Sequence, residues 1–193
     1  MQEWFIMTKK TFVGYTRRGI VTYLNSFREG DTPIVGWSEI IVHHTFAPTV
    51  KNFMEKPDAN FWLTAIDNFH RARGWNGIGY HFVITPDGLI YVGRKLNQVG
   101  AHTVGHNATG IGVCLLGNFD EEEPTVEQWI SLKYLLAWLS YAFNIPIERI
   151  HFHREFALKT CTGKKMDLNK LRKAVQETKP MAVAIWHQII KPS

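Results

Sequence analysis

The chain has 193 residues, of which 45% are hydrophobic and 20% are charged. These values are typical of a globular domain and exclude a disordered or fibrous protein. The net charge of +5 and the isoelectric point near 9.2 favour contact with polyanions, either nucleic acid or the anionic polymers of bacterial walls. Two cysteines, Cys114 and Cys161, are too few for a disulfide framework, so a reduced thiol or a thiolate metal ligand is at least as well supported as a disulfide.

Residues 1–35 are predicted to form a basic N-terminal arm. Its cationic residues include Lys9, Lys10, Arg17 and Arg18. The arm is expected to be either a solvated leader or a segment attracted to anionic wall or membrane polymers. The apolar stretch 1–7 precedes the basic residues, which is the wrong order for a secretory signal, and no apolar run approaches a membrane span of about 20 residues. We therefore expect either synthesis in the cytoplasm without a signal peptide or trimming of the chain before this form.

Strand and helix patterns alternate in the next part of the chain. The β-branched run 40–44 predicts a strand. Apolar residues recur at helical spacing over 61–73, and Gly74 is a natural C-terminal cap, so a helix is predicted there. The runs 80–85 and 89–93 flank the turn sequence Pro-Asp-Gly and predict a β-hairpin.

The second half continues the alternation. The nearly all-apolar run 111–117 predicts a central strand covered on both faces. Thr125 and Gln128 form a capping box that opens a helix to about residue 143. A short strand over 150–153 and a last helix over 168–178 follow, and residues 179–193 are expected to be a docked tail or a linker. The pattern predicts an α/β fold in which residues 36–178 form a single domain with a central mixed β-sheet and helices packed on it.

Histidines and a cysteine supply the candidate metal ligands. His43 and His44 end the first predicted strand, while His151 and His153 lie two apart on the last strand, with Cys161 eight residues after His153. Two histidines and a thiolate would satisfy a catalytic zinc site, which takes three nitrogen or sulfur ligands and keeps one position open. No compact zinc motif is present, however. Taken alone, each histidine is more often a hydrogen-bonded or surface group than a ligand, and a lone cysteine is more often a small buried hydrophobic residue.

Two further side chains are candidates for catalysis. Lys159 lies two residues before Cys161, where an ammonium group would face a developing oxyanion. Tyr80 opens a predicted strand directly after Gly79 and is placed to aim its hydroxyl at the same site. Without further context, a plain surface lysine is the favoured interpretation of Lys159, and a half-buried core tyrosine is an equally good interpretation of Tyr80.

Several stretches, taken in order, resemble the zinc amidases that include phage lysozyme-type N-acetylmuramoyl-L-alanine amidases and the animal peptidoglycan recognition proteins. They lie between residues 36 and 172. The matching stretches are 41–45 (IVHHT), 74–82 (GWNGIGYHF), Asp87-Gly88 through Gly93-Arg94, 100–107 (GAHTVGHN), 111–113 with 117–119 (IGV, GNF), and His153 with Cys161. Their occurrence in one order makes the resemblance specific.

The resemblance implies a role for each matching residue. One zinc ion would be held by His43, His153 and Cys161. Tyr80 and Lys159 match catalytic positions of the active enzymes, and threonine is more common than lysine in the animal members. The residues expected to line the substrate groove are His102, Asn107 and His44.

The resemblance also shows departures from the family pattern. Thr162-Gly163 follows the ligand cysteine where the family usually has Pro-Gly or Pro-Ser, which puts the local turn in doubt. The disulfide cysteines of the animal proteins are absent after the first strand, whereas Cys161, which binding-only members lose, is present. Both differences favour a bacterial or phage enzyme over an immune receptor.

The resemblance implies a hydrolase that cuts the amide bond between N-acetylmuramic acid and the L-alanine of the peptidoglycan stem peptide. We expect a monomeric phage or prophage endolysin, held in the host cytoplasm until its release to the cell wall. The alternatives are a bacterial autolysin or recycling amidase, and a non-catalytic peptidoglycan-binding module. Nucleic-acid binding is not expected, because Trp62, Trp129 and Trp138 fall at helix positions rather than among basic residues.

Overall fold

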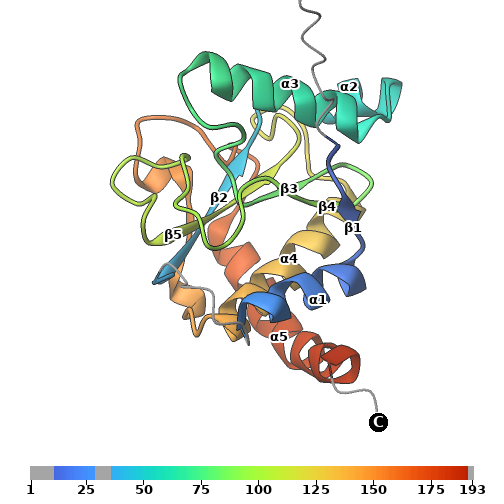
Figure 1. The fold of residues 1–193 in the computed structure, drawn as a ribbon, viewed down its shortest axis with the longest axis vertical. Coiled ribbons are helices and arrows are strands. Elements are labelled where there is room, and N and C mark those ends of the chain that lie inside the picture. The colour runs from blue at the N-terminus through green and yellow to red at the C-terminus, as the bar shows by residue number, and fades with distance from the viewer. Residues whose placement is uncertain (1–10, 29–35, 191–193) are drawn as a thin grey trace, which may run out of the picture.

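The computed structural model describes residues 11–28 and 36–190 and contains a six-stranded mixed sheet with helices on both faces (Figure 1). The strands are β1 (Gly14–Tyr15), β2 (Glu39–His44), β3 (Phe82–Ile84), β4 (Ile90–Val92), β5 (Gly110–Leu115) and β6 (Ile150–Phe152). Their order in the sheet is β1-β4-β3-β5-β2-β6. The predicted α/β fold with a central mixed sheet is confirmed.

Strand β2 lies at the centre of a parallel region. It pairs in parallel with β5 on one side and with β6 on the other, and every residue of β2 and β5 is buried. Parallel strands covered on both faces are expected to be continuously apolar, as the run 111–117 predicted. The two histidines of β2 interrupt that pattern at the carboxyl end of the strand.

The predicted hairpin is present as the antiparallel pair β3 and β4. Its turn contains Gly88 at φ 80°, a conformation in the left-handed region that favours glycine. A Cβ at Gly88 would also lie 2.9 Å from the Cβ of Glu127. Strand β3 pairs in parallel with β5, so the hairpin extends the parallel region into a mixed sheet.

Helices cover both faces of the sheet. They are α1 (Arg17–Arg28), α2 (Val50–Glu55), α3 (Ala59–Ala72), α4 (Val126–Ala142) and α5 (Leu168–Ile190), with short 3-10 turns η1 (Ile147–Arg149) and η2 (His153–Glu155). Helices α1, α4 and α5 pack together on one face, and α3 covers the other (Figure 1). The predicted capping box of α4 is formed by Thr125 and Gln128. None of the helices in the described part of the chain has the length and apolarity needed to cross a bilayer.

The structure differs from the expected N-terminal arm between residues 11 and 28. Strand β1 pairs with β4, and α1 buries Ile20, Val21 and Leu24 in the main core. The apolar residues of α1 recur at helical spacing, but the basic residues at its start make the composition of the segment typical of a solvated arm. Residues 1–10 and 29–35, which make up the rest of the expected arm, lie outside the described residues.

The last helix also extends further than predicted. Helix α5 continues through Pro180 to Ile190, where a docked tail or linker was expected. Ala182 and Trp186 are buried against the core, and the indole N–H of Trp138 donates to the carbonyl of Ala182 at 2.8 Å. Proline in a helix interior costs about 3 kcal/mol, so we infer that this packing offsets the loss. Residues 191–193 lie outside the described residues.

Candidate metal centre

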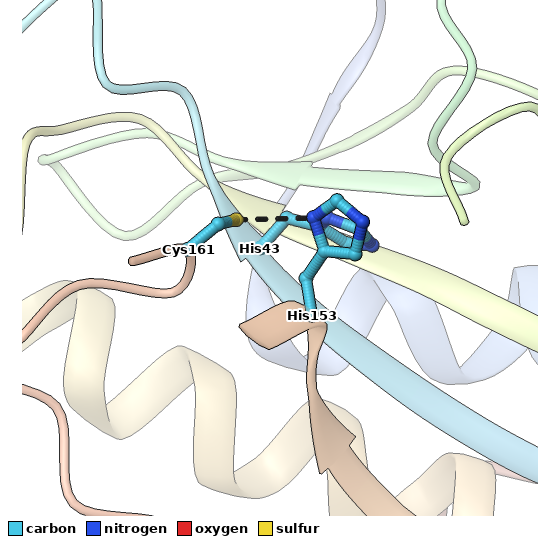
Figure 2. Close-up of side chains that lie close together, drawn as sticks. All are labelled: His43, His153 and Cys161. Atoms are coloured by element: carbon cyan, nitrogen blue, oxygen red, sulfur yellow. Dashed lines mark hydrogen bonds between the residues drawn. The ribbon is translucent and has the colours of Figure 1, made fainter. Parts of the chain in front are cut away.

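The sheet brings the three predicted metal ligands to one edge. Strands β2 and β6 are parallel, so their carboxyl ends meet at the same edge. Side chains alternate along a strand, and since Val42 packs in the core under α1, α4 and α5, His43 faces the opposite side. His153 is the first residue of η2, directly after β6, and Cys161 follows in the loop before α5 (Figure 2).

The three side chains converge as the sequence predicted. Their ligand atoms all lie within 4.8 Å of one another, and the Cys161 sulfur is 3.7 Å from Nδ1 of His43. Zinc bonds to nitrogen and sulfur imply separations of about 3.5 Å between ligands of a tetrahedral site. His43 is buried, whereas His153 and Cys161 are half-buried, so the cluster is open on one side. Two imidazoles, one thiolate and an open position fit a catalytic zinc site.

His151 does not join this cluster. Strand β6 ends at Phe152, so the alternation that would place His151 beside His153 is broken by the turn η2. His151 instead contacts Glu155, with Nδ1 3.0 Å from the carboxylate. No second group of three potential metal ligands is found within residues 11–28 and 36–190.

The protonation states of the ligands follow from burial. Burial lowers the pKa of His43 well below 6.5, and the neighbouring His102 and His153 lower it further. Burial, together with the charge of Lys159, lowers the pKa of His153. Both imidazoles are therefore neutral at physiological pH, the form that binds metal. Burial raises the pKa of the Cys161 thiol to about 11, so metal binding has to displace its proton.

The loop of Cys161 is held from several sides. The backbone N–H of His44 donates to the Cys161 sulfur at 3.4 Å, and the Thr162 hydroxyl donates to the carbonyl of Val42. The N–H of Arg154 also donates to the carbonyl of Cys161 at 2.5 Å. These contacts fix the sulfur against the end of β2, which is what a ligand from a loop requires.

A cavity of about 370 Å³ opens above the cluster and contains both predicted catalytic residues. Lys159 lies on its rim and is exposed. The ring of Tyr80 is 5.1 Å from the ring of His43. Burial raises the pKa of Tyr80 well above 10, with Cys114 and Cys161 adding to the effect, so its hydroxyl stays protonated. None of the described residues that line the cavity is acidic.

The three residues expected to bind substrate have different positions. His44 and His102 line the cavity but are buried, and Nδ1 of His44 accepts the N–H of Phe119 at 3.1 Å. Asn107 is not among the lining residues. Its side-chain oxygen accepts the N–H groups of His102 and Thr103 at 2.7 and 2.9 Å, so the amide holds a loop.

A second, more apolar cavity of about 650 Å³ adjoins the first, and Phe46, Phe69, His70 and Tyr80 line both. Phe69 is 57% exposed, although it belongs to the apolar positions that predicted the helix. Helix α3 instead buries Leu63, Ile66, Asp67 and His70. This groove could not be predicted from the sequence, because an apolar position at helical spacing does not show whether it faces a core or a cleft.

The mixed sheet and the open site of two histidines and a cysteine define the class of the peptidoglycan-recognition and amidase proteins. The chain belongs to the N-acetylmuramoyl-L-alanine amidase family, whose model matches residues 33–167. The endolysin of Escherichia phage T7 is 37% identical over 111 residues, which are 55% of this chain and 72% of the endolysin. Peptidoglycan-recognition protein LB of Drosophila melanogaster is 34% identical over 64% of this chain, and the match spans about half (53%) of that relative.

Solved structures agree with this assignment. The N-acetylmuramoyl-L-alanine amidase LysC of Clostridium intestinale superposes with a TM-score of 0.62 and 34% identity, covering 75% of this chain and 91% of LysC. A point mutant of Drosophila PGRP-LB in complex with tracheal cytotoxin superposes with a TM-score of 0.61 and 30% identity, covering 70% and 82% of the two chains.

Proposed function

We propose that this protein is a zinc-dependent N-acetylmuramoyl-L-alanine amidase that hydrolyses the bond between muramic acid and L-alanine in peptidoglycan. The observation that carries the proposal is the convergence of His43, His153 and Cys161 within 4.8 Å beneath an open cavity. When bound, zinc supplies Lewis acidity and lowers the pKa of water to about 7. The two neutral imidazoles and the thiolate are the donors that would hold it.

Lys159 is proposed to stabilise the negative charge that develops on the carbonyl oxygen of the scissile amide. Its ammonium group lies at the rim of the cavity, and its charge already acts on His153 and Cys161. One preorganised donor of this kind typically contributes about 3 kcal/mol to a transition state.

Tyr80 is proposed to take part in proton transfer during hydrolysis. Its hydroxyl is protonated and its ring lies beside His43, and we propose that the hydroxyl orients the attacking water or donates toward the leaving nitrogen. The carbon–nitrogen bond of the amide breaks and the water oxygen bonds to the carbonyl carbon. The products are a lactyl carboxylate and a peptide with a free L-alanine amine, which takes up a proton.

The shape and charge of the cleft support a muramyl-peptide substrate. The two adjoining cavities form a groove longer than the reacting bond requires, with Phe46, Trp62 and Phe69 along its apolar part. Arg73 and Lys159 supply positive charge beside the metal cluster, which suits a peptide that carries carboxylates.

The biological setting that we propose is a phage or prophage endolysin, which stays in the host cytoplasm until its release to the wall. Similarity to the T7 and T3 endolysins, at 37% and 36% identity, supports it. A bacterial autolysin or recycling amidase would use the same chemistry. The complete donor set, including Cys161, favours either enzyme over a binding module without catalysis.

Digestion of purified peptidoglycan tests the proposal. Mass spectrometry of the soluble products should show peptides with free L-alanine amines and no new reducing sugar ends. A metal chelator should abolish release, and added zinc should restore it. Cys161→Ser should bind zinc poorly and release no peptide, whereas Cys114→Ala, which removes the other thiol of the chain, should keep the metal. Parent-level activity of Cys161→Ser would refute the zinc assignment.

A further inference from the structure

The buried ring of His43 has a second contact, made by the ring nitrogen that does not face Cys161. Its Nε2 lies 3.1 Å from Nδ1 of His102, and the other nitrogen of His102, Nε2, lies 3.0 Å from the carbonyl oxygen of Gly110. The three groups form a chain that begins at a main-chain carbonyl and ends at a predicted metal ligand.

The direction of the hydrogen bonds in this chain follows from its first member. A carbonyl oxygen only accepts, so Nε2 of His102 carries a proton and donates it to Gly110. In a neutral imidazole the other nitrogen is then an acceptor, and Nδ1 of His102 receives the N–H from Nε2 of His43. His43 is left with a free lone pair on Nδ1, the atom that faces the Cys161 sulfur at 3.7 Å.

The surroundings pack closely against the His102 ring. An added Cβ at Gly100 or at Gly112 would lie 2.5 Å from Cδ2 of the His102 ring, so the glycines make room for it from two segments of the chain. The side-chain oxygen of Asn107 accepts the backbone N–H of His102 at 2.7 Å. The ring is thus packed and its backbone is anchored, as a positioning group requires.

We propose that His102 is a positioning residue that fixes the tautomer and ring orientation of His43, so that Nδ1 is presented to the metal. This inference rests on the proposed zinc site and gives His102 a different role from the groove contact expected from the resemblance. Asn107 supports it by holding the loop. Ligating histidines usually need such an outer partner, and its loss typically lowers metal affinity about 10- to 100-fold.

Thr103 is the competing partner. Its hydroxyl lies 3.0 Å from Nδ1 of His102 and 3.4 Å from Nε2 of His43, so it is placed to accept the same proton from a greater distance. The shorter contact of His43 favours His102 as the acceptor. Thr103→Val removes the hydroxyl with little change of shape and therefore separates the two possibilities.

The test compares the zinc affinities of His102→Leu and His102→Asn, measured by competition with a chromophoric chelator. The two side chains have nearly the same shape, but only asparagine keeps an acceptor at the place of Nδ1. His102→Leu should bind zinc about 10- to 100-fold more weakly than the parent. The zinc affinity of His102→Asn should be close to that of the parent, and Thr103→Val should change the zinc affinity of the parent little. Circular dichroism and thermal unfolding check that each variant is folded.

The tautomer itself is measured on the metal-free parent by long-range ¹H–¹⁵N correlation of the histidine rings, with His43 assigned by comparison with His43→Gln. A proton on Nε2 supports the proposal, and a proton on Nδ1 overturns it even when His102→Leu fails to fold. Parent-like zinc affinity in folded His102→Leu, or a loss confined to Thr103→Val, also overturns it. A parent that binds no zinc would instead refute the proposed function.

Discussion

The hydroxyl of Thr160 donates to the carboxylate of Asp120 at 2.5 Å, directly before the ligand Cys161. The other oxygen of Asp120 accepts the backbone N–H of Lys164 at 2.9 Å, three residues after that cysteine. One carboxylate therefore holds the Cys161 loop at both ends. We infer that Asp120 keeps the sulfur in place before a metal arrives.

Removing this carboxylate should weaken the metal site more than the fold. Asp120→Ala deletes both contacts, each of which contributes about 1 kcal/mol in a partly exposed position. We expect zinc affinity to fall up to about 10-fold, with a small decrease in the unfolding temperature. Glu121→Ala is the matched control, because it removes an adjacent exposed carboxylate and keeps the main-chain carbonyl of residue 121 that accepts from Lys165. Equal losses in both variants would point to charge alone and not to the clamp.

Lys159→Ala should slow hydrolysis without releasing the metal. The ammonium group is exposed at the rim of the cavity, so its loss leaves the packing intact. Loss of one oxyanion donor typically lowers kcat about 100- to 1000-fold. Turnover of a soluble muramyl peptide and the zinc content of the purified protein are measured together. Lys164→Ala, which removes another exposed lysine of the same loop, should turn over at the rate of the parent, and a comparable loss there would contradict a specific role for Lys159.

Tyr80→Phe isolates the hydroxyl group while keeping the ring beside His43. General acid–base catalysis by one side chain contributes about 100- to 10,000-fold, so kcat should fall at least 100-fold with little change in KM. The variant should keep its zinc, since it leaves the three grouped donors His43, His153 and Cys161 unchanged. An increase in KM at unchanged kcat would show that the hydroxyl binds substrate rather than moving a proton.

Much of the fold follows from local sequence signals. The Pro-Asp-Gly turn, the capping box at Thr125 and the apolar run of β5 each specify an element through short-range physics, and each is present. The N-terminal helix and the end of α5 were missed for one shared reason. In both, tertiary burial of residues such as Leu24 and Trp186 outweighs a local signal, basic composition in one case and Pro180 in the other.

The metal site, like the fold, could be predicted from the sequence only in part. Histidine and cysteine are common zinc ligands, so the residue types of His43, His153 and Cys161 could be recognised from the sequence. Their proximity depends on the parallel pairing of β2 with β6, which is a tertiary feature. The contacts of His102 are harder to foresee. They depend on which ring nitrogen of His102 donates to the carbonyl of Gly110, and the spacing of residues in the sequence does not determine this.

His81 offers a test of buried electrostatics away from the metal ligands. Its side chain is fully buried, Nδ1 accepts the N–H of Gly112 at 2.9 Å, and Nε2 lies 3.0 Å from the carbonyl of Gln98, to which it donates. Burial lowers the pKa of His81 from 6.5 to about 4. The neutral form fits the folded protein, because protonation of Nδ1 would remove the acceptor for Gly112.

The stability of the protein should therefore fall as the pH falls from about 6.5 to about 4. In that window the unfolded chain binds a proton at His81 and the folded chain does not, so acid favours unfolding. The contribution of His81 is complete above pH 6.5 and is lost by pH 4, a change in the free energy of unfolding of about 3 kcal/mol at most. Below pH 4 both states are protonated and this residue adds no further slope.

Urea unfolding of the metal-free protein between pH 7 and pH 4, with His81→Asn as the comparison, isolates this effect. Asparagine keeps an acceptor for the N–H of Gly112 but does not titrate, and the other histidines contribute equally to both proteins. The variant should be less stable at pH 7, since it leaves space beside Trp37 and loses the bond to Gln98. The gap between the two proteins should narrow as the pH falls, because only the parent loses the His81 contribution. Parallel stability curves would show that His81 titrates alike in the folded and unfolded chains.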